Sequence, residues 1–244
     1  MRADLYLVEH GHFDTRARAQ AAIAAGKVSA NGVTVTKPSQ KIAAGAEIVA
    51  EAAHPWVSRS AMKLVAGLDG FGIDPADRVC VDVGSSTGGF TEVLLSRGAR
   101  HVYAVDVGRD QLHPSLQADR RVTSLESTDA RSLAAEMLSE PPSLVVCDAS
   151  FISLLKVIAR PLALSAATAD LIALIKPQFE VGKALIGKGG LVKSETARHD
   201  AVAAVRAGLE GLEGFSVCAV MESPIEGGDG NKEYLMAATR KLQT

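Results

Sequence analysis

The sequence lacks the features that would place a chain in a membrane or outside the cell. No stretch approaches about 18 consecutive apolar residues, and the N-terminus has no apolar core of a signal peptide. The three cysteines, Cys80, Cys147 and Cys218, form no Cys-x-x-Cys pair, and each lies in an apolar run. That setting predicts reduced thiols buried on strands. We therefore expect a cytoplasmic protein with no membrane partner.

Several common cofactor and metal signatures are missing as well. The chain has no Gly-x-Gly-x-x-Gly dinucleotide fingerprint, no Gly-x-Ser-x-Gly elbow and no cluster of histidines and cysteines. We therefore expect no metal site. The segment Gly182–Gly189 nearly matches a phosphate-binding loop. However, Gly189 stands where Ser or Thr would hold magnesium, and no apolar strand directly precedes the segment.

Charge is nearly balanced over the chain but unevenly spread along it. The formal net charge is -2 over 244 residues, and the 47% hydrophobic content is enough for one sizeable core plus a small domain. Residues 1–60 carry seven Lys and Arg against five Asp and Glu, whereas the remainder carries nineteen against twenty-three. This asymmetry indicates a basic N-terminal module.

Residues 1–53 have the pattern of a small α+β domain. We expect helices over 2–9 and 15–25, a hairpin over 27–36 and a strand within 41–51. Asp14 is a candidate N-cap for the second helix, and Gly26 is a candidate stop for it. The Asn31-Gly32 pair between two β-prone runs is a strong signal for a tight hairpin turn.

Residues 54–58 read as a linker, because Pro55 discourages helix continuation, and Ser58 is a candidate cap for a helix over 59–68. Apolar runs then alternate with helical patterns up to residue 244. Strands are expected over 78–84, 101–107, 122–126, 143–148, 170–176, 215–222 and 232–239, and helices over 90–97, 131–138, 152–165 and 194–213. This alternation predicts an α/β domain over 59–244: a Rossmann-like, doubly wound, largely parallel sheet with helices on both faces.

The most informative run joins an apolar strand to a helix through a turn of small residues. A turn this tight at the carboxyl end of a strand leaves backbone exposed to a small ligand. It resembles the first motif of S-adenosylmethionine-dependent methyltransferases, and the alternative is an ordinary strand-to-helix turn. The candidate cofactor-binding residues in it are Asp82, Gly84, Ser85, Ser86, Thr87, Gly88, Gly89 and Phe90.

Two further acidic residues follow the next two expected strands. Asp106 is a candidate acceptor for ribose hydroxyls, because an acid at the end of the strand after the glycine turn can take that role. Asp129 either accepts from an adenine amino group or caps the following helix, and the sequence leaves both open. Asp82 should lie near the methionine end of the cofactor.

Four charged residues stand at the edges of expected elements. A lysine directly after five apolar residues is unlikely as pure core, since an unpaired buried ammonium is costly. Its natural place is the carboxyl end of its strand, beside the reacting methyl group. The four candidate catalytic residues are Lys63, Asp148, Lys176 and Glu233.

These four residues match the Lys-Asp-Lys-Glu tetrad of ribose 2′-O-methyltransferases related to FtsJ. The N-terminal unit resembles the small RNA-binding domain named for ribosomal protein S-four, on the run from Arg16 to Gly32. The combination resembles the TlyA family, often labelled hemolysin A, over essentially the whole chain. Met62 departs from the family pattern, because many relatives have histidine at this position. The difference concerns how the substrate fits the site and does not affect the tetrad.

The resemblance implies 2′-O-methylation of a cytidine ribose in ribosomal RNA, with S-adenosyl-L-methionine as cofactor. Some relatives act on the large subunit alone and others on both subunits, and the length of this chain, at the short end for the family, favours the large subunit. It implies ribosomal RNA or ribosomal subunits as partner and no stable protein partner. A general base works best with a pKa near the operating pH. Burial and neighbouring positive charges favour an uncharged lysine, and carboxylates oppose it. Lys176 is the preferred base over Lys63, because we expect it to face the methyl group with Lys63 beside it.

RNA contacts are expected from basic residues in both parts of the chain. The candidates are Arg16, Arg18, Lys27, Arg59, Lys183 and Lys188, with Lys193 as a further possibility. For the segment 182–189 a basic loop over the site and a plain solvated loop are both open. Two other functions compete with methyl transfer: a membrane-active hemolysin and a non-catalytic RNA-binding assembly factor. The first finds no support in a spanning helix or long amphipathic helix, and an intact tetrad argues against the second.

Overall fold

The computed structural model describes residues 1–241, and the chain divides into two compact units. The first unit is Met1–Pro55 and the second begins at Trp56. Each has a hydrophobic core of its own. Within residues 1–241, no helix combines the length and apolar character needed to cross a membrane.

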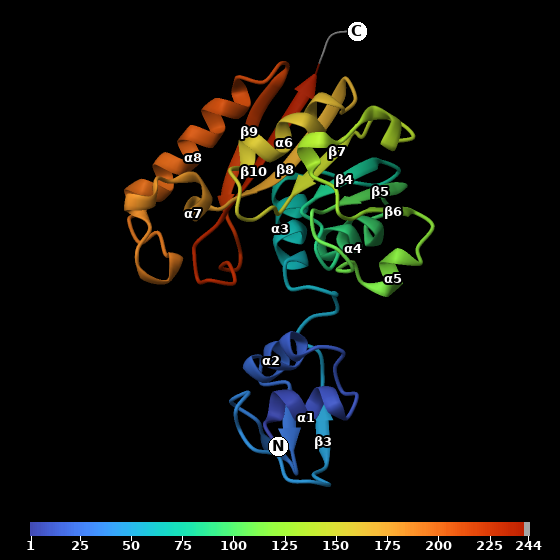
Figure 1. Cartoon of the computed structure of the whole chain (residues 1–244), viewed down its shortest axis with the longest axis vertical. Helices are drawn as coiled ribbons and strands as arrows, with labels where there is room; N and C mark the ends of the chain where they lie inside the picture. Colours follow the sequence, from blue (N-terminus) through green and yellow to red (C-terminus); the bar gives the residue numbers. More distant parts are fainter. Residues whose placement is uncertain (242–244) are drawn as a thin grey trace. The chain divides into compact units, whose positions relative to one another are not determined.

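The first unit packs two helices against a three-stranded antiparallel sheet of order β2-β1-β3 (Figure 1). Its elements are α1 (Ala3–Glu9), α2 (Arg16–Ala24), β1 (Val28–Ala30), β2 (Val33–Thr34) and β3 (Ile48–Ala50). The hairpin turn has the expected backbone, since Asn31 and Gly32 have φ of 50° and 75°. Helix α2 ends before Gly26, whose φ is 69°.

The predicted cap of α2 is wrong by one residue. Thr15 is the N-cap, and its hydroxyl accepts from the backbone N–H of Arg18 at 3.3 Å. The Asp14 carboxylate pairs instead with the Arg18 guanidinium at 3.1 Å. Asp14, next to the cap position, thus forms an i,i+4 ion pair instead of capping the helix. The sequence pattern alone does not distinguish these two roles.

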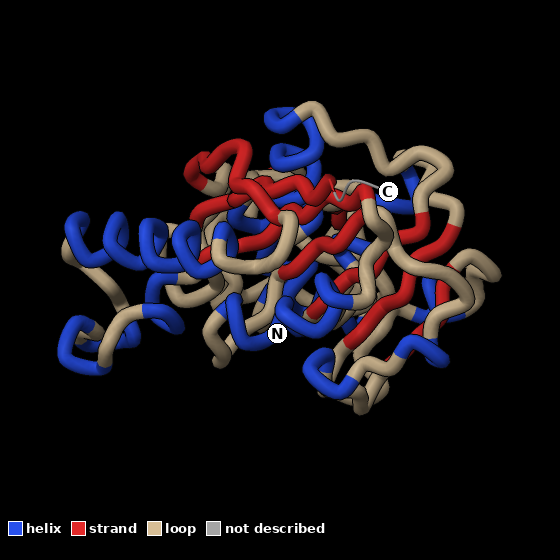
Figure 2. Tube along the Cα trace, turned by 90° about the horizontal axis from the view of Figure 1, so that it is seen from above, coloured by secondary structure: helices blue, strands red, loops and turns tan. Residues whose placement is uncertain are grey.

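The second unit contains a seven-stranded sheet of order β6-β5-β4-β7-β8-β10-β9. Its strands, shown in red in Figure 2, are β4 (Val79–Val83), β5 (His101–Val105), β6 (Val122–Leu125), β7 (Leu144–Cys147), β8 (Thr168–Ile175), β9 (Phe215–Glu222) and β10 (Tyr234–Lys241). The first five are parallel, whereas β10 is antiparallel to both β8 and β9. The sheet is therefore the largely parallel, Rossmann-like sheet that the sequence predicts.

Helices cover both faces of this sheet (Figure 1). Helices α3 (Ala61–Phe71) and α4 (Gly89–Ser96) pack on one face, and α6 (Leu154–Ala163) and α8 (Glu195–Glu210) pack on the other. Alternate residues of the central strands point to the two cores: Val81 and Val145 to one, Cys80 and Leu144 to the other. This period of two is what buries a central strand on both faces. Two short helices, α5 (Pro114–Gln117) and α7 (Pro177–Glu180), were not predicted.

Three expectations about the second unit are wrong. Residues 131–138 form no α-helix but two 3₁₀ turns, Ala130–Ser132 and Ala135–Met137. Leu133, between the two turns, has an extended backbone with φ of -56° and ψ of 128°, and its carbonyl accepts from Arg160 at 2.7 Å. Ser58 does not cap α3, because its hydroxyl contacts Ser60 and the helix begins at Ala61.

The third wrong expectation concerns the cysteines. Cys80 and Cys147 are buried, and burial raises the pKa of both thiols to about 12. Cys218, however, is exposed on β9. Strand β9 is an edge strand, and its residue 218 faces away from the core. An apolar run at the sheet edge therefore does not guarantee burial of every residue in it.

Candidate active site

Four charged side chains meet at one edge of the larger sheet, although they come from distant parts of the chain. They lie on α3, after β7, after β8 and before β10: Lys63, Asp148, Lys176 and Glu233. Parallel strands β7 and β8 end at the same edge. Strand β10 runs antiparallel with Tyr234 opposite Ile175, so the residue before β10 lies next to the residue after β8. The sheet order itself therefore places Glu233 beside Lys176.

The four groups form one chain of alternating charge. Lys63 Nζ donates to Glu233 Oε2 at 2.5 Å and lies 3.9 Å from Asp148 Oδ2. The other oxygen of Asp148 lies 2.7 Å from Lys176 Nζ. Both lysines and Glu233 are at most 7% exposed. Two ammonium groups and two carboxylates balance each other, which is the condition under which such charges tolerate burial.

Ser150 holds Lys176 in place, and the sequence analysis did not identify it. The Lys176 ammonium donates to Ser150 Oγ at 2.8 Å and to the Asp148 carbonyl at 3.1 Å. Lys176 Nζ is also close enough to Asp148 Oδ1 to form an ion pair, but the two groups are not aligned as a hydrogen bond. The ammonium is therefore fixed by the loop that follows β7, with residues 148–150 supplying every acceptor.

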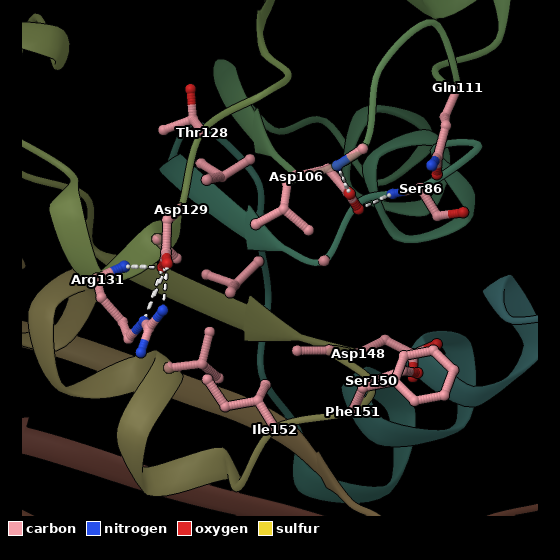
Figure 3. A pocket seen from close by; sticks show the side chains of 18 residues that line it. Ser86, Asp106, Gln111, Thr128, Asp129, Arg131, Asp148, Ser150, Phe151 and Ile152 are labelled. Carbon is pink, nitrogen blue, oxygen red and sulfur yellow. Dashed lines mark hydrogen bonds and ion pairs between the residues drawn. The ribbon is translucent and has the colours of Figure 1, made fainter.

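A cavity of about 500 Å³ opens beside this cluster, at the carboxyl ends of β4, β5 and β7 (Figure 3). This volume is typical of sites for small molecules and cofactors. Asp106 lies on its wall and accepts from the backbone N–H groups of Ser86 at 2.8 Å and Gly108 at 2.7 Å. Asp148 and Ser150 line the same cavity, so it borders the charged cluster directly.

Asp129 lines the cavity on another side, and it also caps the 3₁₀ turn that follows it (Figure 3). Its carboxylate accepts from the Arg131 backbone N–H at 2.9 Å and pairs with the Arg131 guanidinium at 2.5 Å. The Arg131 guanidinium holds the pKa of Asp129 below its usual range. Of the two roles that the sequence leaves open for Asp129, the structure shows capping, and Asp129 also lies on the cavity wall.

The glycine turn has the close backbone approach that its sequence indicates. Gly84 has φ of 79°, and a Cβ there would lie 2.8 Å from the Ala149 Cα. Gly88, with φ of 96°, is the N-cap of α4, and Gly89 is the first residue of that helix against Ser60. Thr87 lines neither this cavity nor its neighbour, and its carbonyl accepts from His113 at 3.2 Å.

Asp82 lies under the turn rather than on a cavity wall. It is fully buried, and the Thr91 hydroxyl donates to its Oδ2 at 2.7 Å. Its Oδ1 is buried with no hydrogen-bond partner among the described residues. Burial raises the pKa of Asp82 to about 7, although the hydrogen bond from Thr91 opposes this shift.

A smaller polar cavity of about 190 Å³ adjoins the first and shares Gly84, Ser86, Asp148 and Ser150 with it. Lys176 lines this smaller cavity, and so do Ser85 and Phe90 of the glycine turn. The Ser85 hydroxyl is buried and unpartnered among the described residues. Two connected cavities thus run from Asp106 past Asp148 to Lys176, while Lys63 and Glu233 stand behind them and line neither.

Three of the predicted RNA-contacting residues belong to the first unit and three to the second, and each of the first four has a hydrogen-bond partner. Arg16 donates to Asp4 at 2.9 Å, Arg18 to Asp14 at 3.1 Å, Lys27 to Glu51 at 2.9 Å and Arg59 to the Glu226 carbonyl at 3.1 Å. Lys183 and Lys188 are exposed and begin two short 3₁₀ turns.

One exposed aromatic residue beside the cavity was also missed. Phe151 is 91% exposed, has φ of 66° and lies 5.3 Å from Phe179 between ring centroids. A large apolar side chain this exposed next to a cavity is unusual for structural reasons alone. The signal in the sequence is its position three residues after Asp148, in the loop that leaves β7.

With the geometry in place, comparison with known proteins identifies both parts of the chain. Residues 56–240 match the model of the FtsJ-like methyltransferases, and residues 1–48 match the S4 domain. The chain belongs to the FtsJ-like methyltransferase family. Its place within that family is the TlyA group, as the relatives below show.

The 16S/23S rRNA (cytidine-2′-O)-methyltransferase TlyA of Mycobacterium tuberculosis is 44% identical over 237 residues, which cover 96% of this chain and 88% of that protein. Hemolysin A of Brachyspira hyodysenteriae is 38% identical over 96% of this chain and 98% of its own length. A solved structure from Streptococcus thermophilus, also given the name hemolysin, superposes with a TM-score of 0.78 at 36% identity, covering 99% of this chain and 88% of that one. An FtsJ-like methyltransferase fold implies use of S-adenosylmethionine.

Proposed function

We propose that this protein transfers a methyl group from S-adenosylmethionine to the 2′-hydroxyl of a cytidine in ribosomal RNA. The observation that carries the proposal is the adjacency of two features. A cavity large enough for a nucleoside shares Asp148 and Ser150 with a buried cluster of two lysines and two carboxylates. The named reaction of the 44% identical Mycobacterium tuberculosis relative supports the same assignment.

The residues around the larger cavity fit S-adenosylmethionine. Asp106 presents a carboxylate for the ribose hydroxyls, and Asp129 lies where it can accept from the adenine amino group. The turn from Gly84 to Phe90 lets the backbone approach the ligand, and the buried Ser85 hydroxyl and Asp82 Oδ1 have hydrogen-bonding capacity to spare. Asp82 acts from below the turn, towards the methionine end.

When bound, S-adenosylmethionine supplies an electrophilic methyl group on a positively charged sulfur. The ribose hydroxyl forms the new C–O bond as the C–S bond breaks, and its proton must leave. Lys176 is our candidate for the proton acceptor, because its Nζ lines the smaller cavity and is held at Asp148 and Ser150. To act so, the ammonium must first pass a proton to solvent. Fixed positioning of hydroxyl and methyl carbon adds to the rate.

Lys63 and Glu233 act from behind the cavities. Lys63 neutralises the second oxygen of Asp148 and is itself held by Glu233. This arrangement keeps the Asp148 carboxylate in a fixed orientation, which in turn fixes Lys176. We propose that the tetrad works as one unit, in which Lys176 faces the reacting atoms and the other three position it.

RNA recognition is proposed for residues 1–53, with 54–58 as linker and 59–244 as the methyltransferase domain. Arg16, Arg18 and Lys27 carry positive charge on the first unit, and Arg59, Lys183 and Lys188 carry it on the second. Contacts of this kind go mainly to phosphates, so RNA affinity should fall steeply with salt. The target nucleotide must also leave its helix to reach the cavity.

Mapping of 2′-O-methylated nucleotides on ribosomal RNA tests this function. The ribosomal RNA of a strain without the gene is compared with that of the same strain carrying the wild-type gene or the Lys176→Ala gene. We expect a 2′-O-methylcytidine that only the wild-type gene restores, in the large subunit or in both subunits. Unmethylated ribosomal RNA in the wild-type strain would contradict the proposal and favour a non-catalytic assembly factor.

A further inference from the structure

Asn231 is a buried polar residue that the reaction described above does not use. It is 2% exposed and lies two positions before Glu233. Its Oδ1 accepts from the Val192 backbone N–H at 2.9 Å, and its Nδ2 donates to the Gly190 carbonyl at 2.9 Å. Asn231 therefore joins the segment before β10 to the segment 182–192, which we call the basic loop.

The same side chain continues to the loop that follows Lys176. Asn231 Nδ2 also donates to Asp229 Oδ2 at 2.9 Å, and Gln178 Nε2 donates to the same oxygen at 3.1 Å. Gln178 belongs to α7, which starts directly after Lys176. One hydrogen-bonded network thus connects three segments: the helix after Lys176, the basic loop and the turn before Glu233.

The network at Asn231 supplies two of the hydrogen bonds that attach the basic loop, whose last residue, Val192, is also buried. Its residues are mostly exposed, and it carries Lys183 and Lys188. Its other backbone hydrogen bonds are internal, such as Gly187 N–H to the Leu191 carbonyl at 2.9 Å. Among the described residues, its side-chain hydrogen bonds to the rest of the unit come from Asn231 and from Arg198, which donates to the Val192 carbonyl at 2.9 Å.

The turn that contains Asn231 also encloses Glu233. A Cβ at Gly227 would lie 2.6 Å from Glu233 Oε1, so the backbone of the turn packs directly on that carboxylate. The turn is closed by Gly227 N–H donating to the Asn231 carbonyl at 2.9 Å. A change at Asn231 thus reaches both the basic loop and the support of Glu233.

We propose that Asn231 is a positioning residue that holds the basic loop beside the tetrad, so that Lys183 and Lys188 meet the phosphates of the RNA substrate. The proposal rests on the proposed function for the identity of the substrate. No residue of the basic loop or of the turn 227–231 lines either cavity at the glycine turn. Loss of the hydrogen bonds of the Asn231 side chain should therefore weaken the use of the RNA substrate and leave S-adenosylmethionine binding intact.

Asn231→Asp tests the role of the Asn231 amide with little change in the shape of the side chain. It replaces a donor by a charged acceptor that faces the Gly190 carbonyl and the Asp229 carboxylate, and a buried acceptor without a donor is unfavourable. We expect trypsin to cleave after Lys183 and Lys188 about tenfold faster than in the wild type, and kcat/KM for RNA to fall by about the same factor. The S-adenosylmethionine dissociation constant, measured by calorimetry, should not change.

Asn31→Asp is the matched control, because it makes the same chemical change where only Oδ1 is used, as acceptor from Glu47 at 2.8 Å. Its trypsin cleavage and cofactor affinity should equal those of the wild type. The double variant Asp229→Asn/Asn231→Asp should recover part of the loss. The amide then lies at position 229 and can donate to the carboxylate at 231, and Gln178 can turn its unpartnered Oε1 towards that amide.

Two results would overturn the proposal. One is wild-type cleavage of the basic loop in Asn231→Asp, and the other is faster cleavage with unchanged kcat/KM for RNA. If Asn231→Asp does not fold, Asn231→Ser removes the amide without adding a charge and is read in the same way. If the wild-type protein methylates no ribosomal RNA, the proposed function fails, whereas the cleavage rates still decide whether Asn231 holds the loop.

Discussion

Lys63 and Glu233, which are 170 positions apart in the chain, form a buried ion pair with 2.5 Å between Nζ and Oε2. Neither side chain is more than 8% exposed. The pair joins helix α3 to the start of β10 and stands behind the two cavities. Its position suggests that it contributes both to the stability of this corner of the fold and to the orientation of Asp148.

Breaking this pair from one side should be costly. Lys63→Met leaves Glu233 buried without its cation, and we expect the free energy of unfolding to fall by about 3–5 kcal/mol. The double variant Lys63→Met/Glu233→Leu should regain most of that stability and still fail to transfer methyl groups. Urea unfolding and a methyl-transfer assay give the two quantities. A double variant that is as active as the wild type would show that Lys63 and Glu233 are not needed for methyl transfer.

Asp82 should make stability depend on pH. Burial raises its pKa from an ordinary 3.8 to about 7 in the folded protein, so the folded state binds a proton more tightly than the unfolded state. This contribution to stability is fully present below the unfolded value and is lost as pH rises through about 7. In urea unfolding measured between about pH 5 and 8, the free energy of unfolding of the wild type should fall through this effect as pH rises, and that of Asp82→Asn should not. Parallel pH profiles of the two proteins would contradict the assignment.

The backbone approach at Gly84 can be tested by a single methyl group. Gly84→Ala places a side chain at a φ of 79° and within 2.8 Å of the Ala149 Cα. We expect the free energy of unfolding to fall by about 1–3 kcal/mol, and cofactor affinity to fall with it, because the turn must shift. Gly228→Ala is the control, since a Cβ there meets nothing within 4 Å. Equal cofactor affinity in both variants would show that the turn does not approach the ligand.

Arg16 is the sharpest test of RNA binding by the first unit. It is one of three side chains that donate to the buried Asp4, and Arg2 and Gln20 hold that carboxylate without it. Hydrogen bonds from Arg2 and Gln20 keep the pKa of Asp4 well below its usual range. Arg16→Ala should therefore fold normally.

If the Arg16 guanidinium meets a phosphate, its loss should weaken RNA binding and reduce the slope of log affinity against log salt by about 1. Filter binding over a salt series measures this slope. Lys156→Ala, on the exposed side of α6, supplies the comparison. An unchanged slope in Arg16→Ala would exclude Arg16 from the phosphate contacts.

Much of the second unit could be predicted because its central strands contain apolar runs, such as Leu144–Cys147 and residues 171–175, that charged residues follow directly. Asp148 and Lys176 follow such runs directly, so their place at the carboxyl edge follows from the parallel sheet. Glu233 is different, because its place depends on β10 inserting between β8 and β9. That order arises from pairing between distant segments, which local patterns do not encode. The sequence indicates Glu233 only by its position at the start of an expected strand and by its match to the family tetrad.

The residues that the sequence did not indicate act through tertiary contacts. Ser150 matters because Lys176 reaches back to it, and Asn231 because two loops meet on its amide. The failed helix over 131–138 has the same origin. Its composition favours a helix, but the backbone at Leu133 is extended, and its carbonyl accepts from Arg160 on another element.

The central claim is that Lys176 acts on the RNA hydroxyl and not on cofactor binding. Lys176→Ala and the control Lys156→Ala are compared in transfer of labelled methyl from S-adenosylmethionine to ribosomal subunits, with cofactor affinity measured by calorimetry. The account predicts a loss of at least about 10²-fold in the transfer rate for Lys176→Ala, with cofactor affinity unchanged. Transfer at the wild-type rate by Lys176→Ala would contradict it.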